Sequence, residues 1–325
     1  FSQPQRARPM KAALAQAGQV EIQETAKPSP EANEVLIRNQ AAGINRADLA
    51  QLAGRYLPPA GASQVLGLEC SGIIEEVGSN LSGDLVGRQV CALLAGGGLA
   101  EFTAVPVEHT LPVPQGLDLM QAAALPETFA TAWLNLKLEG RLQPNEKVLV
   151  HAGASGVGVS AIQLCQQWGN PVFVTVGSQD KLKRCLQLGA QAGALRDEDW
   201  SGAVDAWGKA DVILDPVGGS YLSQNIHSLR PLGRLVCIGI LGGPEGTLPV
   251  GRLLVNRLQV VGSVLRSRSK AEKSHIVQTL HQEVWPLLST GKIAPIIHSS
   301  LPFHEIDKAY QLMANNQNFG KILIT

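Results

Sequence analysis

Residues 147–164 read KVLVHAGASGVGVSAIQL, and this stretch decides the fold. An apolar run typical of a buried strand leads into a turn of small residues, and helical spacing of apolar residues follows. Gly153, Ser155 and Gly158 have the spacing of G-x-G-x-x-G, with serine in the middle position. Such a turn lets backbone approach a pyrophosphate, and the helix N-terminus offers free amides to the anion. The motif predicts a dinucleotide site, and the alternative is a turn that only packs a helix on a sheet.

The chain after this turn alternates between strands and helices. Strands are predicted at 147–153, 171–177, 211–219 and 234–240, and helices at 158–169 and 179–190. This alternation implies parallel strands joined by crossover helices. We therefore expect an α/β domain over 127–265.

The two ends of the chain have a different sequence pattern. Short strands separated by turns are predicted at 34–44, 70–78, 84–93 and 100–106, a pattern compatible with a compact barrel. The tail, from about 290, again contains short strands and ends in KILIT. If that last strand rejoins the first domain, the α/β unit is an insertion, which gives a first domain of 10–126 plus 266–325.

Composition excludes several classes of function. The 325 residues carry 27 basic and 27 acidic side chains and are 45% hydrophobic, so nothing indicates binding to nucleic acid or to a membrane surface. Five widely spaced cysteines indicate free thiols in a reducing, cytoplasmic setting. The nine residues before Met10 are excluded from the expected fold as a cloning scar, an upstream extension or the remnant of a processed leader. If they are the remnant of a leader, an organelle becomes a possible location.

The end of the second predicted strand distinguishes between the two nicotinamide cofactors. A carboxylate there would bind the ribose 2′-hydroxyl and repel a 2′-phosphate. The sequence has Gly177, Ser178 and Gln179 at this point, with Lys181 just beyond and Arg196 where the third strand should end. Because both cations can pair with a phosphate, the sequence favours NADPH.

Several separated strings resemble one family. NRAD at 45–48, GRYLPPAGASQVLGLECSG at 54–72, GSQDKL at 177–182, DPVGGSY at 215–221 and SVLRSR at 263–268 resemble the zinc-independent quinone oxidoreductases of the medium-chain dehydrogenase/reductase superfamily. The resemblance implies a GroES-like β-barrel catalytic domain, an inserted Rossmann domain with a doubly wound parallel sheet, a homodimer, and a cofactor in the cleft between the domains.

The resemblance also implies roles for single residues. It gives catalytic roles to Asn45, Tyr56 and Ser155, whose alternative roles are a turn residue, a packed loop tyrosine and a small side chain chosen for space. Arg196 departs from the family, where tyrosine is common. The cofactor would be held by Asp48, Thr131, Gly153, Ser155, Gly156, Val157, Gly158, Gly177, Ser178, Lys181, Arg196, Gly239, Leu265, Arg266, Asn318 and Lys321.

No metal site is expected. Zinc-dependent relatives use a cysteine near position 45 and a Gly-His-Glu string, whereas this chain has Asn45 and Gly67-Leu68-Glu69. The predicted function is hydride transfer from NADPH to a small-molecule quinone, without a dedicated proton-donating dyad. The alternatives are an alkenal or enone reductase that uses NADPH, and a weakly catalytic NADPH-binding structural protein.

Overall fold

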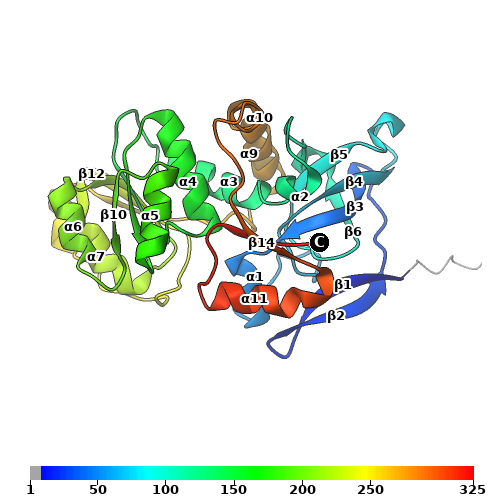
Figure 1. The fold of residues 1–325 in the computed structure, drawn as a ribbon, viewed down its shortest axis with the longest axis horizontal. Coiled ribbons are helices and arrows are strands. Elements are labelled where there is room, and N and C mark those ends of the chain that lie inside the picture. The colour runs from blue at the N-terminus through cyan, green and yellow to red at the C-terminus, as the bar shows by residue number, and fades with distance from the viewer. Residues whose placement is uncertain (1–8) are drawn as a thin grey trace, which may run out of the picture. The chain divides into compact units, whose positions relative to one another are not determined.

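The computed structural model describes residues 9–325, which form two compact units (Figure 1). The first unit contains the chain up to Glu127 and again 266–325, and the second contains 128–265. Glu127, which we expected to open the second domain, belongs to the first unit. Among residues 9–325, no helix is long and apolar enough to cross a membrane.

The second unit is built on a six-stranded parallel sheet with the order β10-β9-β8-β11-β12-β13. Its strands are β8 (Val148–Val150), β9 (Val172–Val176), β10 (Ala192–Leu195), β11 (Ala210–Asp215), β12 (Leu229–Cys237) and β13 (Gln259–Gly262). The strand order reverses between β8 and β11, which is the doubly wound topology expected from the sequence. In such sheets ligands bind beyond the carboxyl ends of the strands at this switch point.

Helices precede and connect the strands of this sheet. They are α3 (Pro126–Trp133), which continues as the π-helix η3 (Leu134–Glu139), α4 (Gly156–Trp168), α5 (Gln179–Leu188), α6 (Trp200–Trp207), η4 (Gly219–Tyr221), α7 (Leu222–His227) and α8 (Val250–Val255). On one face of the sheet, Leu149 and Ile213 pack with Trp200 and Val204 of α6 and with Ile226 of α7. This apolar core fixes the strand ends that carry the predicted dinucleotide site.

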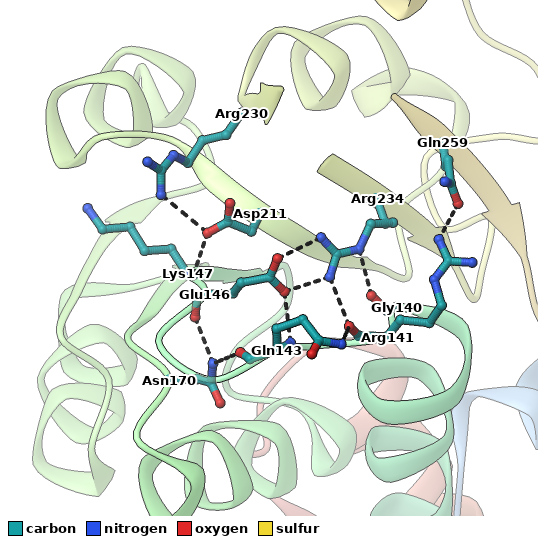
Figure 2. A network of polar contacts seen from close by, with 10 residues as sticks. All are labelled: Gly140, Arg141, Gln143, Glu146, Lys147, Asn170, Asp211, Arg230, Arg234 and Gln259. Carbon is teal, nitrogen blue, oxygen red and sulfur yellow. Dashed lines mark hydrogen bonds and ion pairs between the residues drawn. The ribbon is translucent and has the colours of Figure 1, made fainter. Parts of the chain in front are cut away.

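A polar network ties the loop before β8 to the sheet (Figure 2). The Arg234 guanidinium donates to both carboxylate oxygens of Glu146, at 2.9 and 2.6 Å, and to the carbonyl oxygens of Gly140 and Arg141. Asn170 Nδ2 donates to the Glu146 carbonyl oxygen at 2.9 Å. A bidentate guanidinium–carboxylate pair fixes orientation as well as distance, so this network sets where β8 begins.

The first unit contains a seven-stranded sheet with the order β14-β15-β3-β4-β5-β7, in which β6 also pairs with β3. Its strands are β3 (Glu34–Gly43), β4 (Glu69–Val77), β5 (Gln89–Leu93), β6 (Phe102–Pro106), β7 (Thr110–Pro112), β14 (Ile297–Leu301) and β15 (Lys321–Ile324). The hairpin of β1 (Pro9–Gln16) and β2 (Gln19–Ala26) forms a separate sheet. Pro9 pairs with Ala26, so it belongs to the fold although we had excluded it. Residues 1–8 lie outside the described residues.

The last strand rejoins the first unit, as predicted, because β15 runs antiparallel to β3 (Figure 1, red beside blue). One expected strand is shorter than predicted: β5 starts at Gln89, because the 3₁₀ turn η1 (Gly83–Leu85) and a left-handed Gly87 interrupt 84–88. Five helices and two further 3₁₀ turns complete the described part of the unit: α1 (Arg46–Leu52), η2 (Val107–His109), α2 (Leu119–Ala122), α9 (Lys270–Glu283), α10 (Trp285–Ser289), η5 (Phe303–Glu305) and α11 (Ile306–Ala314). All five cysteines are free, as expected.

Candidate functional site

The small residues of the turn after β8 are required by close packing. A Cβ on Gly153 would lie 2.7 Å from Val174 Cβ, and one on Gly158 would lie 2.4 Å from the Ala152 carbonyl oxygen. The left-handed residue of the turn is Ala152, with φ of 53°, and not one of the glycines. The glycines therefore let helix α4 approach the turn and strand β9 closely.

The amides at the start of α4 form a cradle for an anion. Ser155 is the N-cap, and its Oγ accepts from the Gly158 amide at 3.0 Å. Within the described residues, the amides of Gly156 and Val157 have no protein acceptor. Two free amides at the positive end of a 13-residue helix suit a phosphate. The serine at the middle motif position thus has a definite structural role, and its own proton is free to donate.

A buried chain of polar groups lies beneath this turn. His151 is 1% exposed; its Nδ1 lies 2.8 Å from Thr175 Oγ1 and its Nε2 lies 2.6 Å from Asn225 Oδ1. Asn225 Nδ2 donates to Asp215 at 3.0 Å, which leaves its oxygen facing His151, so Nε2 carries the imidazole proton. Burial lowers the pKa of His151 to about 4. The neutral histidine joins the carboxyl ends of β8, β9 and β11.

The end of β9 carries positive charge. Ser178 is the N-cap of α5 and accepts from the Lys181 amide at 3.3 Å. A Cβ on Gly177 would lie 3.4 Å from Arg196 Cζ, so the exposed guanidinium lies directly over the glycine. The structure thus places the Arg196 guanidinium over Gly177, next to the Ser178 N-cap, and Lys181 in the first turn of α5.

Three other predicted cofactor residues of this unit are spread over different elements. Thr131 lies on α3 and is partly buried. Gly239 follows β12, where a Cβ would lie 2.6 Å from the Pro216 carbonyl oxygen at the end of β11. Leu265 is buried at the end of the unit. Gly239 therefore lies next to the switch point of the sheet.

In the first unit, Asn45 is the N-cap of α1, and the Asp48 side chain binds its backbone amide. The Asn45 amide donates to Asp48 Oδ2 at 2.7 Å, and the Gly67 amide donates to Oδ1 at 3.1 Å. Burial raises the pKa of Asp48 to about 6. With both carboxylate oxygens bound to backbone amides, Asp48 fixes the start of α1, a structural role that its expected part in cofactor binding did not include.

Lys321 forms the centre of a buried ionic cluster. Its Nζ donates to the Ile44 carbonyl oxygen at 2.8 Å, to Asn45 Oδ1 at 2.8 Å and to Glu69 Oε1 at 2.6 Å. An ammonium has three N–H groups, so none remains for another acceptor. The geometry therefore does not support the expected role of Lys321 in holding a cofactor.

The same cluster fixes the side chain of Asn45. Its Oδ1 accepts from Lys321 and its Nδ2 donates to Glu69 Oε1 at 3.1 Å. These two partners fix the orientation of the side-chain amide. The other carboxylate oxygen, Glu69 Oε2, accepts from the Glu127 amide at 2.9 Å. Asn45 thus keeps one lone pair on Oδ1, and can accept a hydrogen bond more readily than donate one.

Arg266 supports the loop that carries Tyr56. The guanidinium is 3% exposed and donates to Ala95 O and Gln51 Oε1, both at 2.8 Å, and to Tyr56 O at 3.4 Å. It lies 5.3 Å from the centre of the Tyr56 ring. Most of its donors are committed to this loop, so we assign it a positioning role in place of the expected contact with a cofactor. Asn318 is also used internally, because Nδ2 donates to the Gly320 carbonyl oxygen at 2.8 Å.

The Tyr56 hydroxyl is open to a ligand. It makes no hydrogen bond within the described residues, and the side chain is partly buried. Burial, together with the nearby charge of Glu127, raises the pKa of Tyr56. The phenol therefore keeps its proton and can donate it in a hydrogen bond.

Two residues of this site were missed from the sequence. Glu69 is fully buried, and the pKa of Glu127 is raised to about 8 by burial first and by the charge of Glu69 second. A signal existed, because each is a lone charge within an otherwise apolar run, GLECSGII at 67–74 and AAALPETFA at 122–130. Buried charges of this kind are rare unless they are paired or functional.

Comparison with known proteins identifies the family. Residues 31–115 match the alcohol dehydrogenase GroES-like domain and 156–282 match the zinc-binding dehydrogenase domain. The synaptic vesicle membrane protein VAT-1 homologs of Rattus norvegicus and Homo sapiens are each 30% identical, over 91% and 92% of this chain and 78% and 80% of those proteins. The homolog from Danio rerio is also 30% identical, and the chain spans 65% of that longer protein. The chain belongs to the medium-chain dehydrogenase/reductase superfamily.

Solved structures agree with this fold. The quinone oxidoreductase of Thermus thermophilus, also solved as its complex with NADPH, is 32% identical with a TM-score of 0.83, covering 97% of this chain and 99% of that one. The quinone oxidoreductase of Pseudomonas syringae pv. Tomato is 25% identical with a TM-score of 0.85, covering 98% and 99%. The human VAT-1 homolog-like protein is 27% identical with a TM-score of 0.84, covering 97% and 98%.

Proposed function

We propose that this protein is an NADPH-dependent quinone oxidoreductase that works without zinc. The observation that supports the proposal is a pair of features that suit phosphate groups, the free amides at the start of α4 and the Arg196 guanidinium over Gly177 at the end of β9. The relative from Thermus thermophilus, solved with NADPH, supports the cofactor. Within the family, the strings quoted above resemble those of the tumour-suppressor-inducible quinone oxidoreductases of animals.

The second unit supplies the groups that would hold the cofactor. The amides of Gly156 and Val157 would bind the pyrophosphate, and the absence of a Cβ at Gly153 and Gly158 keeps the turn tight enough to present them. Arg196 and Lys181, with the Ser178 hydroxyl, would bind the 2′-phosphate, while Thr131, Gly239 and Leu265 remain proposed neighbours of the nicotinamide half. When bound, NADPH would supply a hydride, which carries the two electrons of the reduction.

The donor set of the first unit does not fit zinc. At the positions where zinc-dependent relatives have Cys and His ligands, the chain has Asn45 and Leu68. The Lys321 ammonium already contacts both Asn45 and Glu69, so a divalent cation would meet a fixed positive charge. Within residues 9–325, no group of three or more His, Cys, Asp or Glu could hold a metal ion.

Tyr56 and Asn45 are the proposed contacts of the acceptor. The Tyr56 hydroxyl would donate to a quinone oxygen, and the fixed Asn45 Oδ1 would accept from a reduced, protonated one. Such groups contribute by positioning the acceptor and stabilising charge that develops on its oxygen. The Ser155 hydroxyl, although used as a cap, retains a proton that it can donate.

The test compares acceptors and cofactors. NADPH oxidation is followed with an ortho-quinone and with an α,β-unsaturated aldehyde. Turnover with the quinone supports the proposal, turnover with the aldehyde alone favours an enone reductase, and tight NADPH binding without turnover favours a structural protein.

The cofactor sites are tested by substitution at the end of β9. Arg196→Ala and Lys181→Ala should each raise KM for NADPH about 10- to 100-fold, from a charged hydrogen bond of about 1.5–3 kcal/mol, with little effect on NADH. Lys183→Ala, on the exposed face of the same helix, is the matched control. Equal effects on both cofactors would contradict the assignment of the 2′-phosphate site.

We further propose that the protein is a homodimer. Strand β13 is an edge strand, and Val260 on it and Leu254 and Val255 on α8 are exposed. An open apolar edge is a template for pairing with another chain, and a second copy of the same strand would cover it. Light scattering of the purified protein should give twice the mass of the chain, and Val260→Lys should give the monomer.

A further inference from the structure

A buried tetrad of polar side chains, Thr175, His151, Asn225 and Asp215, lies beneath the turn that follows β8. Thr175 Oγ1 lies 2.8 Å from His151 Nδ1, and His151 Nε2 lies 2.6 Å from Asn225 Oδ1. Asn225 Nδ2 then donates to Asp215 Oδ2 at 3.0 Å. All four residues are at most 2% exposed. The buried tetrad thus joins β9, β8, α7 and β11 through one continuous line of hydrogen bonds.

The protons of the buried tetrad all point the same way. The Asp215 carboxylate accepts, so Asn225 turns its amide nitrogen toward Asp215 and its oxygen toward His151. The histidine therefore donates from Nε2, which leaves Nδ1 to accept the proton of the Thr175 hydroxyl. Burial lowers the pKa of His151, which keeps the imidazole neutral, as this pattern requires. The tetrad thus has one consistent orientation, from the Thr175 hydroxyl to the Asp215 carboxylate.

The Asp215 end of the buried tetrad holds the loop beyond β11. Its Oδ1 accepts from the Val217 amide at 2.8 Å, and its Oδ2 accepts from the Gly218 amide at 3.1 Å. Gly218 has a φ of 78°, a left-handed value that glycine adopts without strain. Two backbone amides and one side-chain amide on a single carboxylate fix the direction in which the loop leaves the strand.

This loop packs directly against the loop that follows β12. The Gly242 amide donates to the Val217 carbonyl oxygen at 2.7 Å. The Leu241 amide donates to the Pro216 carbonyl oxygen at 3.2 Å. A Cβ on Gly239 would lie 2.6 Å from the same Pro216 oxygen, so only glycine allows the two backbones to approach this closely. A shift of the loop beyond β11 would therefore move Gly239, the proposed neighbour of the nicotinamide half.

The location of the buried tetrad in the sheet also points to the cofactor. The tetrad crosses from β8 to β11, the switch point beyond which ligands bind in a doubly wound sheet. The His151 ring lies edge-on to the rings of Trp200 and Tyr221, with 4.7 and 4.8 Å between ring centres, which limits its rotation. Apolar side chains of the same shape could fill this space at little cost in stability, whereas a satisfied polar network also fixes one arrangement.

We propose that His151 and Asn225 are positioning residues that hold the loop beyond β11 for the nicotinamide half of NADPH, an inference that rests on the proposed function. They act through Asp215 and not by contact with the cofactor or the acceptor. The groups proposed to bind the phosphates, the amides at the start of α4 and the Arg196 guanidinium, are not members of the buried tetrad. Breaking the tetrad should therefore affect the nicotinamide end of the cofactor and leave the phosphate end unchanged.

The experiment breaks the buried tetrad at Asn225 and compares two ligands. Asn225→Leu keeps the approximate size of the side chain and removes both of its hydrogen bonds. The Kd is measured for NADPH and for adenosine 2′,5′-bisphosphate, which carries the 2′-phosphate but no nicotinamide. In Asn225→Leu the Kd for NADPH should rise about 5-fold, as for the loss of one ordinary hydrogen bond, and the Kd for the bisphosphate should not change. Gln224→Leu, exposed on the same helix, is the matched control and should match wild type for both ligands.

Two substitutions of His151 test whether the hydrogen bonds or the packing matter. His151→Leu should weaken NADPH binding as Asn225→Leu does, because neither bond of the imidazole can form. His151→Gln should keep most of the binding, because its side-chain nitrogen can still donate to Asn225. If Asn225→Leu does not fold, the comparison of these two variants decides the inference.

The rate of hydride transfer provides a second measurement. Protein loaded with NADPH is mixed with an ortho-quinone, and the first turnover should be about 10- to 100-fold slower in Asn225→Leu, because the nicotinamide is misplaced. Equal weakening of both ligands, or unchanged binding of NADPH, would show that the buried tetrad only stabilises the unit and would overturn the inference. If wild type binds NADPH but reduces no quinone, the proposed function fails, while the two Kd values still decide the inference. If wild type binds neither ligand, both fail.

Discussion

Replacing Lys321 by methionine tests the buried ionic cluster directly. The change keeps the length of the side chain and removes the ammonium, so Glu69 loses an ion pair of 2.6 Å while remaining fully buried. Only the amides of Asn45 and Glu127 would still donate to it. Because removing one partner strands a buried charge, we expect the free energy of unfolding to fall by about 3–5 kcal/mol.

The assay is urea unfolding at neutral pH, with hydrogen exchange of the β3 and β15 amides to assign the loss to this unit. Glu69→Gln and the double variant complete a double-mutant cycle. The double variant should cost at least about 2 kcal/mol less than the sum of the single ones, because neither charge is then left unpaired. A loss below about 1 kcal/mol in Lys321→Met would show that water screens the pair as it does at a surface, and would refute the buried cluster.

Three further predictions concern the second unit. Glu146→Gln should lower the free energy of unfolding, measured in urea, by about 1–3 kcal/mol. Because the Arg234 pair lowers the pKa of Glu146, the difference from wild type should be complete above about pH 4.5. The difference should vanish as the pH falls through the lower pKa of the folded state. The pKa of His151 is about 4 in the folded protein and 6.5 in the unfolded chain. Between pH 6.5 and pH 4, the free energy of unfolding of wild type should therefore fall by about 3 kcal/mol relative to that of His151→Gln. Thermal unfolding of the two proteins with the same dependence on pH would contradict a buried, neutral His151. Ser155→Ala should lower the free energy of unfolding by about 0.5–2 kcal/mol, because the N-cap of α4 is lost. Ser155→Val should also lower the rate of quinone turnover, because its branched side chain fills the turn. Unchanged turnover in Ser155→Val would show that Ser155 has no part in the mechanism.

The Rossmann unit was predictable because its signals are local. A strand, a turn of small residues and a helix follow one another within about twenty residues, and each has its own pattern in the sequence. The left-handed position was not predictable in the same way, because it is Ala152 and not a glycine. The predicted start of β5 was also wrong. The pattern of DLVGRQVCAL predicts a strand from residue 84, but the left-handed turn at Gly87 makes the strand begin at Gln89.

The roles of the charged residues were harder to predict, because they depend on contacts between distant parts of the chain. The family resemblance implied that Lys321 and Arg266 contact the cofactor, and nothing in the local sequence contradicted it. The antiparallel pairing of β15 with β3 instead places Lys321 at Asn45, at the start of α1, and beside Glu69 of β4. No local pattern shows where such a side chain points, so these roles required the tertiary structure.

The balance of charge in the first unit favours a bound anion. Its interacting groups are three carboxyls, Asp48, Glu69 and Glu127, and three cations, Lys321, Lys273 and Arg266. While Glu127 keeps its proton, the cations exceed the carboxylates by one, which favours an anion bound nearby.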